Sequence, residues 1–224
     1  NSIHRVTIQG YSSDGMGIAR IDSFVVFVRE GIRGETCDVR IVRPLKNMAY
    51  AIIERIVEPS PERREPECPH YRHCGGCAFL HMSYEEELRA KLDRVNDAMT
   101  RLGGLDLCLE RVNGADRTGG YRNKAQFFVS PRGEVGFYRA RSHDLCAVRS
   151  CAIQDARADA CADALRQWME TSGAVPYDER HHKGLVRGLQ VRSGTGGVWA
   201  TVISAGLELP DEDGLCAELR KACP

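Results

Sequence analysis

The sequence predicts a small β-barrel followed by an α+β domain whose sheet is mostly antiparallel. Three observations support this prediction. The first 57 residues alternate short apolar runs with glycine-rich turns and show no helical period. A proline-rich, charged stretch then interrupts the pattern. Beyond it, helical patterns alternate with further short strands. We therefore expect a first domain over residues 1–57, a linker over 58–67 and a second domain over 68–224.

The barrel is expected to contain five short strands. A glycine-punctuated turn over 10–17 follows the first strand, and residues 22–23 and 31–34 separate later ones. The predicted strands cover 3–9, 18–21, 24–28, 35–42 and 49–56.

The second domain opens with a predicted helix. Ser83 followed three residues later by Glu86 is a capping-box pattern, and Gly103 with Gly104 is a stop signal. Apolar residues between them recur every three or four positions, which predicts one core-facing stripe. The stripe consists of Leu88, Leu92, Val95, Met99 and Leu102.

Two predicted hairpins and two more helices complete this domain. The hairpins join 121–129 to 135–139 and 186–192 to 198–204. The helix between them should begin after Asp155, bury Cys161, Leu165, Trp168 and Met169, and end at Gly173. A last helix should start near Asp213.

Charge and hydropathy limit the classes of function. The 224 residues contain 31 Lys and Arg against 31 Asp and Glu. Zero net charge argues against a protein that binds polyanions over its whole surface, but it allows a basic face on a neutral protein. No apolar run reaches the ~18 residues of a transmembrane helix, and no signal-peptide pattern starts the chain. We expect a cytoplasmic monomer that has no contact with a membrane.

Three of the ten cysteines fall within ten residues, at Cys68, Cys74 and Cys77. Such crowding favours a metal centre, because a cation relieves the cost of ionising neighbouring thiols. Gly75 and Gly76 allow the backbone to turn tightly around such a centre. The spacing leaves two alternatives open. An iron–sulfur cluster would take a fourth cysteine from elsewhere, whereas zinc could be completed by a histidine. The candidates for the fourth position are Cys108, Cys146, Cys151, Cys161, Cys216 and Cys223, or His70 and His73 for zinc.

Basic and aromatic residues alternate in the strands of the second domain. Cations pair with phosphates, and rings or guanidinium planes stack on unpaired bases, so this composition suits RNA. The alternative is a solvated sheet face opposite a core face. The candidate RNA contacts are Arg122, Lys124, Arg139, Arg141 and Arg187.

Two resemblances to known families follow from these motifs. Residues 15–20, 25–28 and 31–35 resemble a TRAM domain, an OB-like barrel that binds RNA. Residues 68–77 resemble the cluster motif of the 23S ribosomal RNA (uracil-C5)-methyltransferases, and residues 121–127 resemble a strand of the same family. The resemblance implies a [4Fe–4S] cluster on Cys68, Cys74, Cys77 and Cys151, ribosomal RNA as partner, and S-adenosylmethionine in the full-length protein. Cys146, five residues before Cys151, is the other candidate for the fourth ligand.

No catalytic residue is expected in this chain. The glycine-rich run 194–197 joins two predicted strands, unlike the strand–turn–helix unit of a methyl-donor site. The family adds a cysteine thiolate to uracil C6, and no cysteine here stands in that context. We expect the catalytic domain downstream and this portion alone to be inactive. The rival interpretations are a non-catalytic zinc or RNA-binding module and, less well matched in cysteine spacing, a radical methylthiotransferase.

Overall fold

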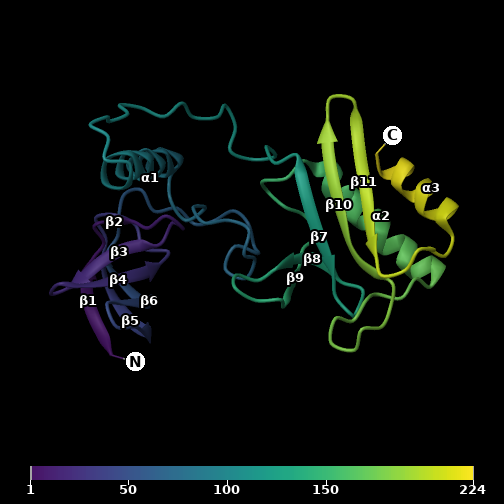
Figure 1. Cartoon of the computed structure of the whole chain (residues 1–224), viewed down its shortest axis with the longest axis horizontal. Helices are drawn as coiled ribbons and strands as arrows, with labels where there is room; N and C mark the ends of the chain where they lie inside the picture. The colour runs from purple at the N-terminus through teal and green to yellow at the C-terminus, as the bar shows by residue number, and fades with distance from the viewer. Residues whose placement is uncertain (1, 224) are drawn as a thin grey trace. The chain divides into compact units, whose positions relative to one another are not determined.

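Two separate β-sheets organise the chain in the computed structural model, which describes residues 2–223 (Figure 1). Contacts group the chain into two units. The first unit contains the chain up to Glu67 together with Cys77–Ala115, and the second contains Cys68–Gly76 and everything from Asp116. The chain therefore passes from one unit to the other after Glu67, after Gly76 and after Ala115.

The first unit contains a curled, mixed six-stranded sheet, a half-barrel, where a barrel was predicted. Its edge strands β1 and β2 are separated in sequence only by Ile8 and Gln9. The Ile8 N–H donates to the Glu35 carbonyl (2.9 Å) and the Gln9 N–H to the Ile18 carbonyl (2.7 Å), so this short link bridges the two ends of the curl. The sheet order is β1 (Ile3–Thr7), β5 (Thr36–Pro44), β6 (Met48–Glu58), β4 (Phe24–Arg29), β3 (Gly17–Ile21) and β2 (Gly10–Tyr11), with only β4 and β6 parallel among these neighbours.

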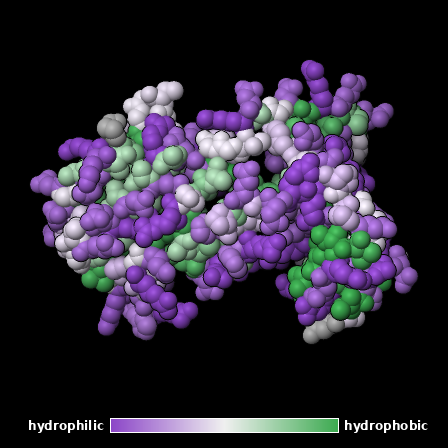
Figure 2. Space-filling view, turned by 180° about the vertical axis from the view of Figure 1, so that it is seen from behind, coloured by the Kyte–Doolittle hydropathy of each residue, from purple (hydrophilic) through white to green (hydrophobic). Residues whose placement is uncertain are grey.

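The half-barrel encloses a core of small, mostly β-branched side chains. Every second residue of β4 and of β5 up to Ile41 points inward, as the period of a half-buried strand requires. The inward set includes Ala19, Val26, Val28, Val39 and Ala51. In the view from behind, hydrophobic side chains also gather on the outside at one end of this unit (Figure 2). Large exposed apolar residues of its strands are Ile3, Val42 and Val57.

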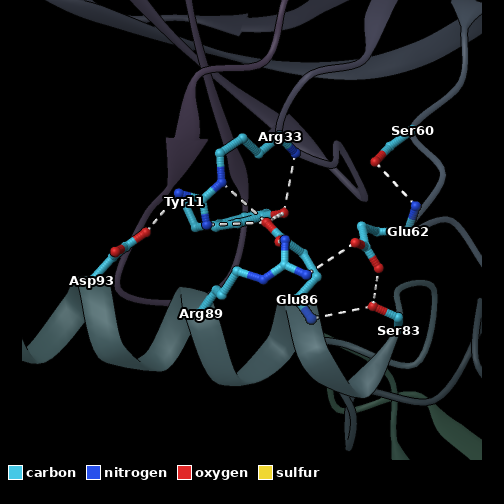
Figure 3. Close-up of polar contacts among 8 residues, drawn as sticks. All are labelled: Tyr11, Arg33, Ser60, Glu62, Ser83, Glu86, Arg89 and Asp93. Atoms are coloured by element: carbon cyan, nitrogen blue, oxygen red, sulfur yellow. Dashed lines mark hydrogen bonds and ion pairs between the residues drawn. The ribbon is translucent and has the colours of Figure 1, made fainter. Parts of the chain in front are cut away.

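Helix α1 (Tyr84–Asp97) is held to the half-barrel by polar contacts (Figure 3). The Ser83 hydroxyl caps the helix by accepting the Glu86 N–H (3.1 Å), as predicted. The buried Glu86 carboxylate accepts the Tyr11 hydroxyl (2.7 Å) and pairs with Arg33 (3.0 Å). Arg33 also pairs with Asp93, two turns further along the same face of the helix (2.7 Å).

The end of this helix differs from the prediction. The α-helix stops at Asp97 and continues as one π-helical turn, η1 (Ala98–Leu102), before Gly103. Val95 and Leu102, predicted to pack inward, are 41% and 87% exposed. The predicted core stripe is therefore wrong at its carboxyl end. The π turn moves Leu102 off the helical period, whereas Val95 is exposed within the α-helix itself.

The predicted linker packs into the first unit. Arg63 reaches the fully buried Glu35 carboxylate with both Nε (2.6 Å) and Nη2 (2.7 Å), and the Ser60 N–H donates to the same group (3.3 Å). Together with α1, this groups 58–67 and 77–115 with the half-barrel, a division that differs from the predicted boundaries at 57 and 68. A buried ion pair between residues 28 apart leaves no compositional signal, and a proline-rich charged stretch suggests a linker instead.

The second unit is a five-stranded antiparallel sheet with helices on one face (Figure 1). Phe127 and Leu189 on the sheet pack against Leu165 and the fully buried Trp168 on α2. The α2 helix is capped by Asp155 and ends at Gly173 with φ of 69°, both as predicted. None of the helices within residues 2–223 is long and apolar enough to cross a bilayer. The elements are β11 (Gly197–Ser204), β10 (Val186–Gly194), β7 (Lys124–Val129), β8 (Val135–Tyr138) and β9 (Leu145–Ala147) in sheet order, with α2 (Ala156–Ser172) and α3 (Glu212–Ala222).

Candidate functional site

The loop 68–76 folds against the turn that follows β8. Within the loop, the Cys74 N–H donates to the His70 carbonyl (2.7 Å). The Gly75 N–H donates to the Tyr138 carbonyl (3.1 Å), and a Cβ at Gly75 would stand 2.9 Å from the Ala140 nitrogen. A side chain is therefore excluded at Gly75, and the glycine allows the cysteine loop to approach this turn closely.

Four cysteines of the second unit act on one another electrostatically. Burial raises the pKa of the Cys74 thiol, and negative charge on Cys146 and Cys68 raises it further. Burial also raises the pKa values of Cys146 and Cys151, and each is raised further by charge on Cys68. Cys68 thus lies near three other thiols, two of which come from residues that are more than 70 positions away in sequence.

Backbone amides favour the thiolate form at two of these positions. The Gly76 N–H lowers the pKa of Cys74, opposing burial, and the Ile153 and Gln154 N–H groups do the same at Cys151. The Cys151 N–H is itself held by Asp159 Oδ2 (2.9 Å). Half-buried thiols with amides directed at sulfur are suited to a soft metal or an iron–sulfur centre. Among residues 2–223, no three His, Cys, Asp or Glu side chains converge closely enough to hold an ion as they stand.

Cys146 and Cys151 differ in accessibility. Cys146 is 6% exposed on β9, in register with Phe137 of β8, whereas Cys151 is half-buried in the loop before α2. Both lie near Cys68, so the structure keeps both as candidates for a fourth ligand. Cys77 begins the next stretch of the first unit, and its prediction rests on the sequence spacing.

The remaining cysteines stand apart from this group. Cys37 is buried in β5, where burial raises its pKa to about 11. Cys161 on α2 has its Sγ 3.5 Å from that of Cys223, and burial raises its pKa to about 12. Cys108 and Cys216 are exposed. High pKa values keep these buried thiols protonated and unreactive.

The five predicted RNA contacts all lie in the second unit, and two are beside the cysteines. Positive charge on Arg122 lowers the pKa of Cys74, and charge on Arg139 lowers that of Cys146. Arg122 precedes β7 and is fixed by its backbone, whose N–H donates to the Ile153 carbonyl (2.8 Å). Arg141 lies in the turn after β8 with φ of 58°. The turn that carries Arg139 and Arg141 is the one against which the cysteine loop packs.

Arg187 and Lys124 are in different surroundings. The Arg187 guanidinium pairs with Glu179 (2.6 Å) and lies over the Tyr177 ring at 4.6 Å, so much of its charge is already balanced. Lys124 begins β7 on the sheet face opposite the helices, and no ion-pair partner is found for it among the described residues.

Around the predicted contact Lys124, this outer face carries residues that were not among the predicted RNA contacts. Lys124, Arg192 and Trp199 stand side by side on three neighbouring strands, and Gln126, Gln190 and Thr201 form the next row. The signal was available in β11, because Val198, Ala200 and Val202 pack toward the core and Trp199 falls out of phase with them.

Comparisons with known proteins agree with this architecture. A TRAM-domain model matches residues 1–53, which confirms that resemblance. The chain is 39% identical to an uncharacterised RNA methyltransferase of Clostridium tetani over 98% of its length, and 34% identical to one of Bacillus cereus over its full length. It covers 49% and 50% of these two proteins, so it spans about half the length of the curated relatives it matches.

A solved structure shares the fold. It is the Pyrococcus abyssi tRNA (uracil-54, C5)-methyltransferase in complex with S-adenosyl-L-homocysteine, with a TM-score of 0.68 and 18% identity. The match covers 94% of this chain and 48% of that one. At this identity the similarity establishes the fold.

Proposed function

We propose that this chain is the RNA-handling portion of an S-adenosylmethionine-dependent methyltransferase that modifies C5 of uridine in ribosomal RNA in the cytoplasm. The similarity to RNA methyltransferases along the whole chain, 39% over 98% of its length, carries the proposal. The TRAM match and the fold shared with a uracil-C5 enzyme support the reaction class. We assign the catalytic role to none of these 224 residues.

The reaction is tested in a strain that lacks the gene encoding this chain. Ribosomal RNA from this strain should lose 5-methyluridine at one or more positions, and the intact gene should restore it. Mass spectrometry of ribosomal and transfer RNA distinguishes the outcomes. Loss confined to transfer RNA would overturn the ribosomal substrate, and unchanged 5-methyluridine in both RNAs would overturn the reaction.

Within this function we propose that Cys68, Cys74, Cys77 and Cys151 hold a [4Fe–4S] cluster. Charge on Cys68 acts on both Cys74 and Cys151, which supports these three ligands, and the spacing of Cys77, two glycines after Cys74, supports the fourth. Four thiolate ligands would leave the cluster a structural or RNA-positioning role. The protein residues would contribute amide N–H groups that stabilise the sulfur charge at Cys74 and Cys151.

Metal content tests this assignment. Protein purified without oxygen should be brown and contain about four irons per chain. Cys151→Ser should lose iron, whereas Cys216→Ser, at an exposed cysteine away from the group, should keep it. Iron loss from Cys146→Ser with retention in Cys151→Ser would transfer the fourth ligand to Cys146. Stoichiometric zinc in colourless protein would overturn the cluster and favour a zinc-bearing RNA-binding module.

We propose that Arg122, Lys124, Arg139, Arg141 and Arg187 contact RNA phosphates. Arg122 and Arg139 support this best, because their charges act on Cys74 and Cys146, and Arg141 lies in the same turn as Arg139. Arg187 would have to exchange Glu179 for phosphate. Binding should weaken as salt rises, since each phosphate contact releases counterions. In the double variant Arg122→Ala/Lys124→Ala, the slope of the logarithm of the binding constant against the logarithm of the salt concentration should become shallower by about 1 to 2. Arg132→Ala, at an exposed arginine in the β7–β8 turn, is the control, and unchanged binding in the double variant would move the RNA surface elsewhere.

A further inference from the structure

We propose that the outer face of the second unit's sheet binds a single-stranded segment of RNA, with a base stacked on Trp199 and phosphates on Lys124 and Arg192. This inference rests on the proposed RNA binding and specifies the form of RNA that is recognised. It also assigns a role to Trp199 and Arg192, which lie outside the cysteine group.

The exposure of Trp199 is the first observation. Its side chain is 60% exposed, while the other tryptophan, Trp168, is fully buried in the core of the same unit. The indole lies beside Gly194, where a Cβ would be in van der Waals contact with the ring, 3.4 Å from Cζ3 of Trp199. A large aromatic ring left in water at a fixed position is a stacking surface for a planar partner.

The pairing of Lys124 with Arg192 is the second observation. These two residues are directly opposite each other on β7 and β10, and Trp199 is opposite Arg192 on β11. Like charges at such a position destabilise a sheet, and an anion between them removes the repulsion. Neither cation has an ion-pair partner among the described residues, and the rows around them contain no acidic side chain. Strands are spaced by about 4.8 Å, so the lysine and the indole stand ~10 Å apart, within reach of one nucleotide and its neighbour.

The next rows of the same face supply groups for unpaired bases. Gln126 and Gln190 lie opposite each other, and their amides can both donate and accept hydrogen bonds at base edges. Further along β7, the Phe128 ring stacks on Tyr138 with centroids 3.9 Å apart. Cations, amides and rings on a sheet face that no helix of this unit covers match the way single-stranded RNA is held.

Tryptophan fluorescence provides the test, because Trp199 is accessible and Trp168 is an internal reference. The 224-residue chain is titrated with a ten-nucleotide oligouridylate and with a blunt RNA duplex of equal length. We expect quenching by the single strand and little by the duplex. Trp199→Ala should abolish the quenching and weaken single-strand binding, measured by anisotropy of labelled RNA, by roughly 5- to 100-fold. Trp199→Phe should retain most of the affinity. Leu207→Ala truncates an exposed side chain outside the rows of Lys124, Arg192 and Trp199, and it should bind RNA as the unmodified chain does.

The outcomes separate this inference from the proposed function. Retained Trp168 emission and far-ultraviolet dichroism show that each variant is folded. Single-strand binding by Trp199→Ala equal to that of the unmodified chain would overturn the stacking role. Preference for the duplex would overturn the single-strand assignment. In either case the loss of 5-methyluridine from the gene-deleted strain would still support the methyltransferase function.

Discussion

Glu35 is the most completely enclosed charge of the first unit. Its carboxylate accepts hydrogen bonds from Nε and Nη2 of Arg63, from the Ser60 N–H and from the Ile32 N–H (3.0 Å). Four donors satisfy its oxygens, which is the condition under which a buried carboxylate is tolerated. The adjoining His81 is 1% exposed, and burial together with positive charge on Arg63 lowers its pKa to about 4.

This histidine makes the first unit sensitive to acid. Its folded pKa lies below the unfolded value near 6.5, so its unfolded form binds a proton first as pH falls. The neutral His81 therefore contributes its full share of the free energy of unfolding above pH 6.5. As pH falls from about 6.5 to 4, the free energy of unfolding should decrease by about 3 kcal/mol. Asp38, whose pKa the Arg5 and Arg55 guanidinium groups lower to about 2, loses its contribution only below about pH 4. Urea denaturation at pH 7.5 and 4.5 should show this loss.

Two variants identify the source of that pH dependence. His81→Gln should flatten it, because the titrating group is removed, even where the variant is less stable at both pH values. His4→Gln, at a histidine on β1, should retain it. A slope in His81→Gln equal to that of the unmodified chain would assign the acid sensitivity to other groups.

At the scale of the element, Glu86 of α1 belongs to the capping-box pattern at the start of the helix and also attaches the helix to the half-barrel. The capping-box pattern predicted that Ser83 would accept the Glu86 N–H, and it does. The glutamate side chain, however, is buried against Tyr11 and Arg33 rather than closing the reciprocal half of the box (Figure 3). Its first-turn position and its burial together fix both where the helix starts and where it docks.

Removing the Glu86 side chain should release this helix. Glu86→Ala leaves the Tyr11 hydroxyl without its acceptor and leaves Arg33 with Asp93 alone, and a buried polar group that loses its partner costs about 1–3 kcal/mol. Hydrogen exchange should accelerate in 84–97 while β4 to β6 stay protected. Glu85→Ala is a matched control, because this exposed neighbour occupies the same first turn. Equal protection of the helix in both variants would show that apolar packing, not Glu86, holds it.

Periodicity and turn residues predicted the elements that depend on neighbouring residues. The hairpin turn near 194–197, the cap at Asp155 and the buried face of α2 follow from local spacing, and the structure confirms them. The short strand β9 was missed, because three residues carry too little alternation to stand out. The sequence named both Cys146 and Cys151 as candidates to approach Cys68 but could not decide between them, since that depends on how β9 and the cysteine loop pack within the second unit.

At the scale of the whole molecule, the chain enters the second unit twice. Cys68–Gly76 lies in that unit, the chain returns to the first unit for 77–115, and it enters the second again at Asp116. The proposed ligands are divided accordingly. Three come before the exposed segment around Arg111 and Arg117, and Cys151 comes after it.

Cutting that segment should leave the protein in one piece while a cluster is bound. A specific protease site placed between 111 and 117 allows a single cut in a stretch without helix or strand. The cut protein should elute as one species from a sizing column, and oxidative removal of the iron should shift it toward two fragments. Cut Cys151→Ser should separate without that treatment. Fragments that stay together equally well with and without iron would show that the cluster makes no link between them.

The placement of Cys68–Gly76 in the second unit, between two stretches of the first, also limits how recombination can exchange the two units between genes. A single genetic crossover between 58 and 67 would give one descendant a half-barrel without α1, and would give the other α1 without the sheet that Glu86 and Arg33 tie it to. Exchanging either unit whole would need breakpoints near 67, 76 and 115 at once. The two units are therefore expected to share one ancestry, and phylogenies built separately from their residues should have the same branching order.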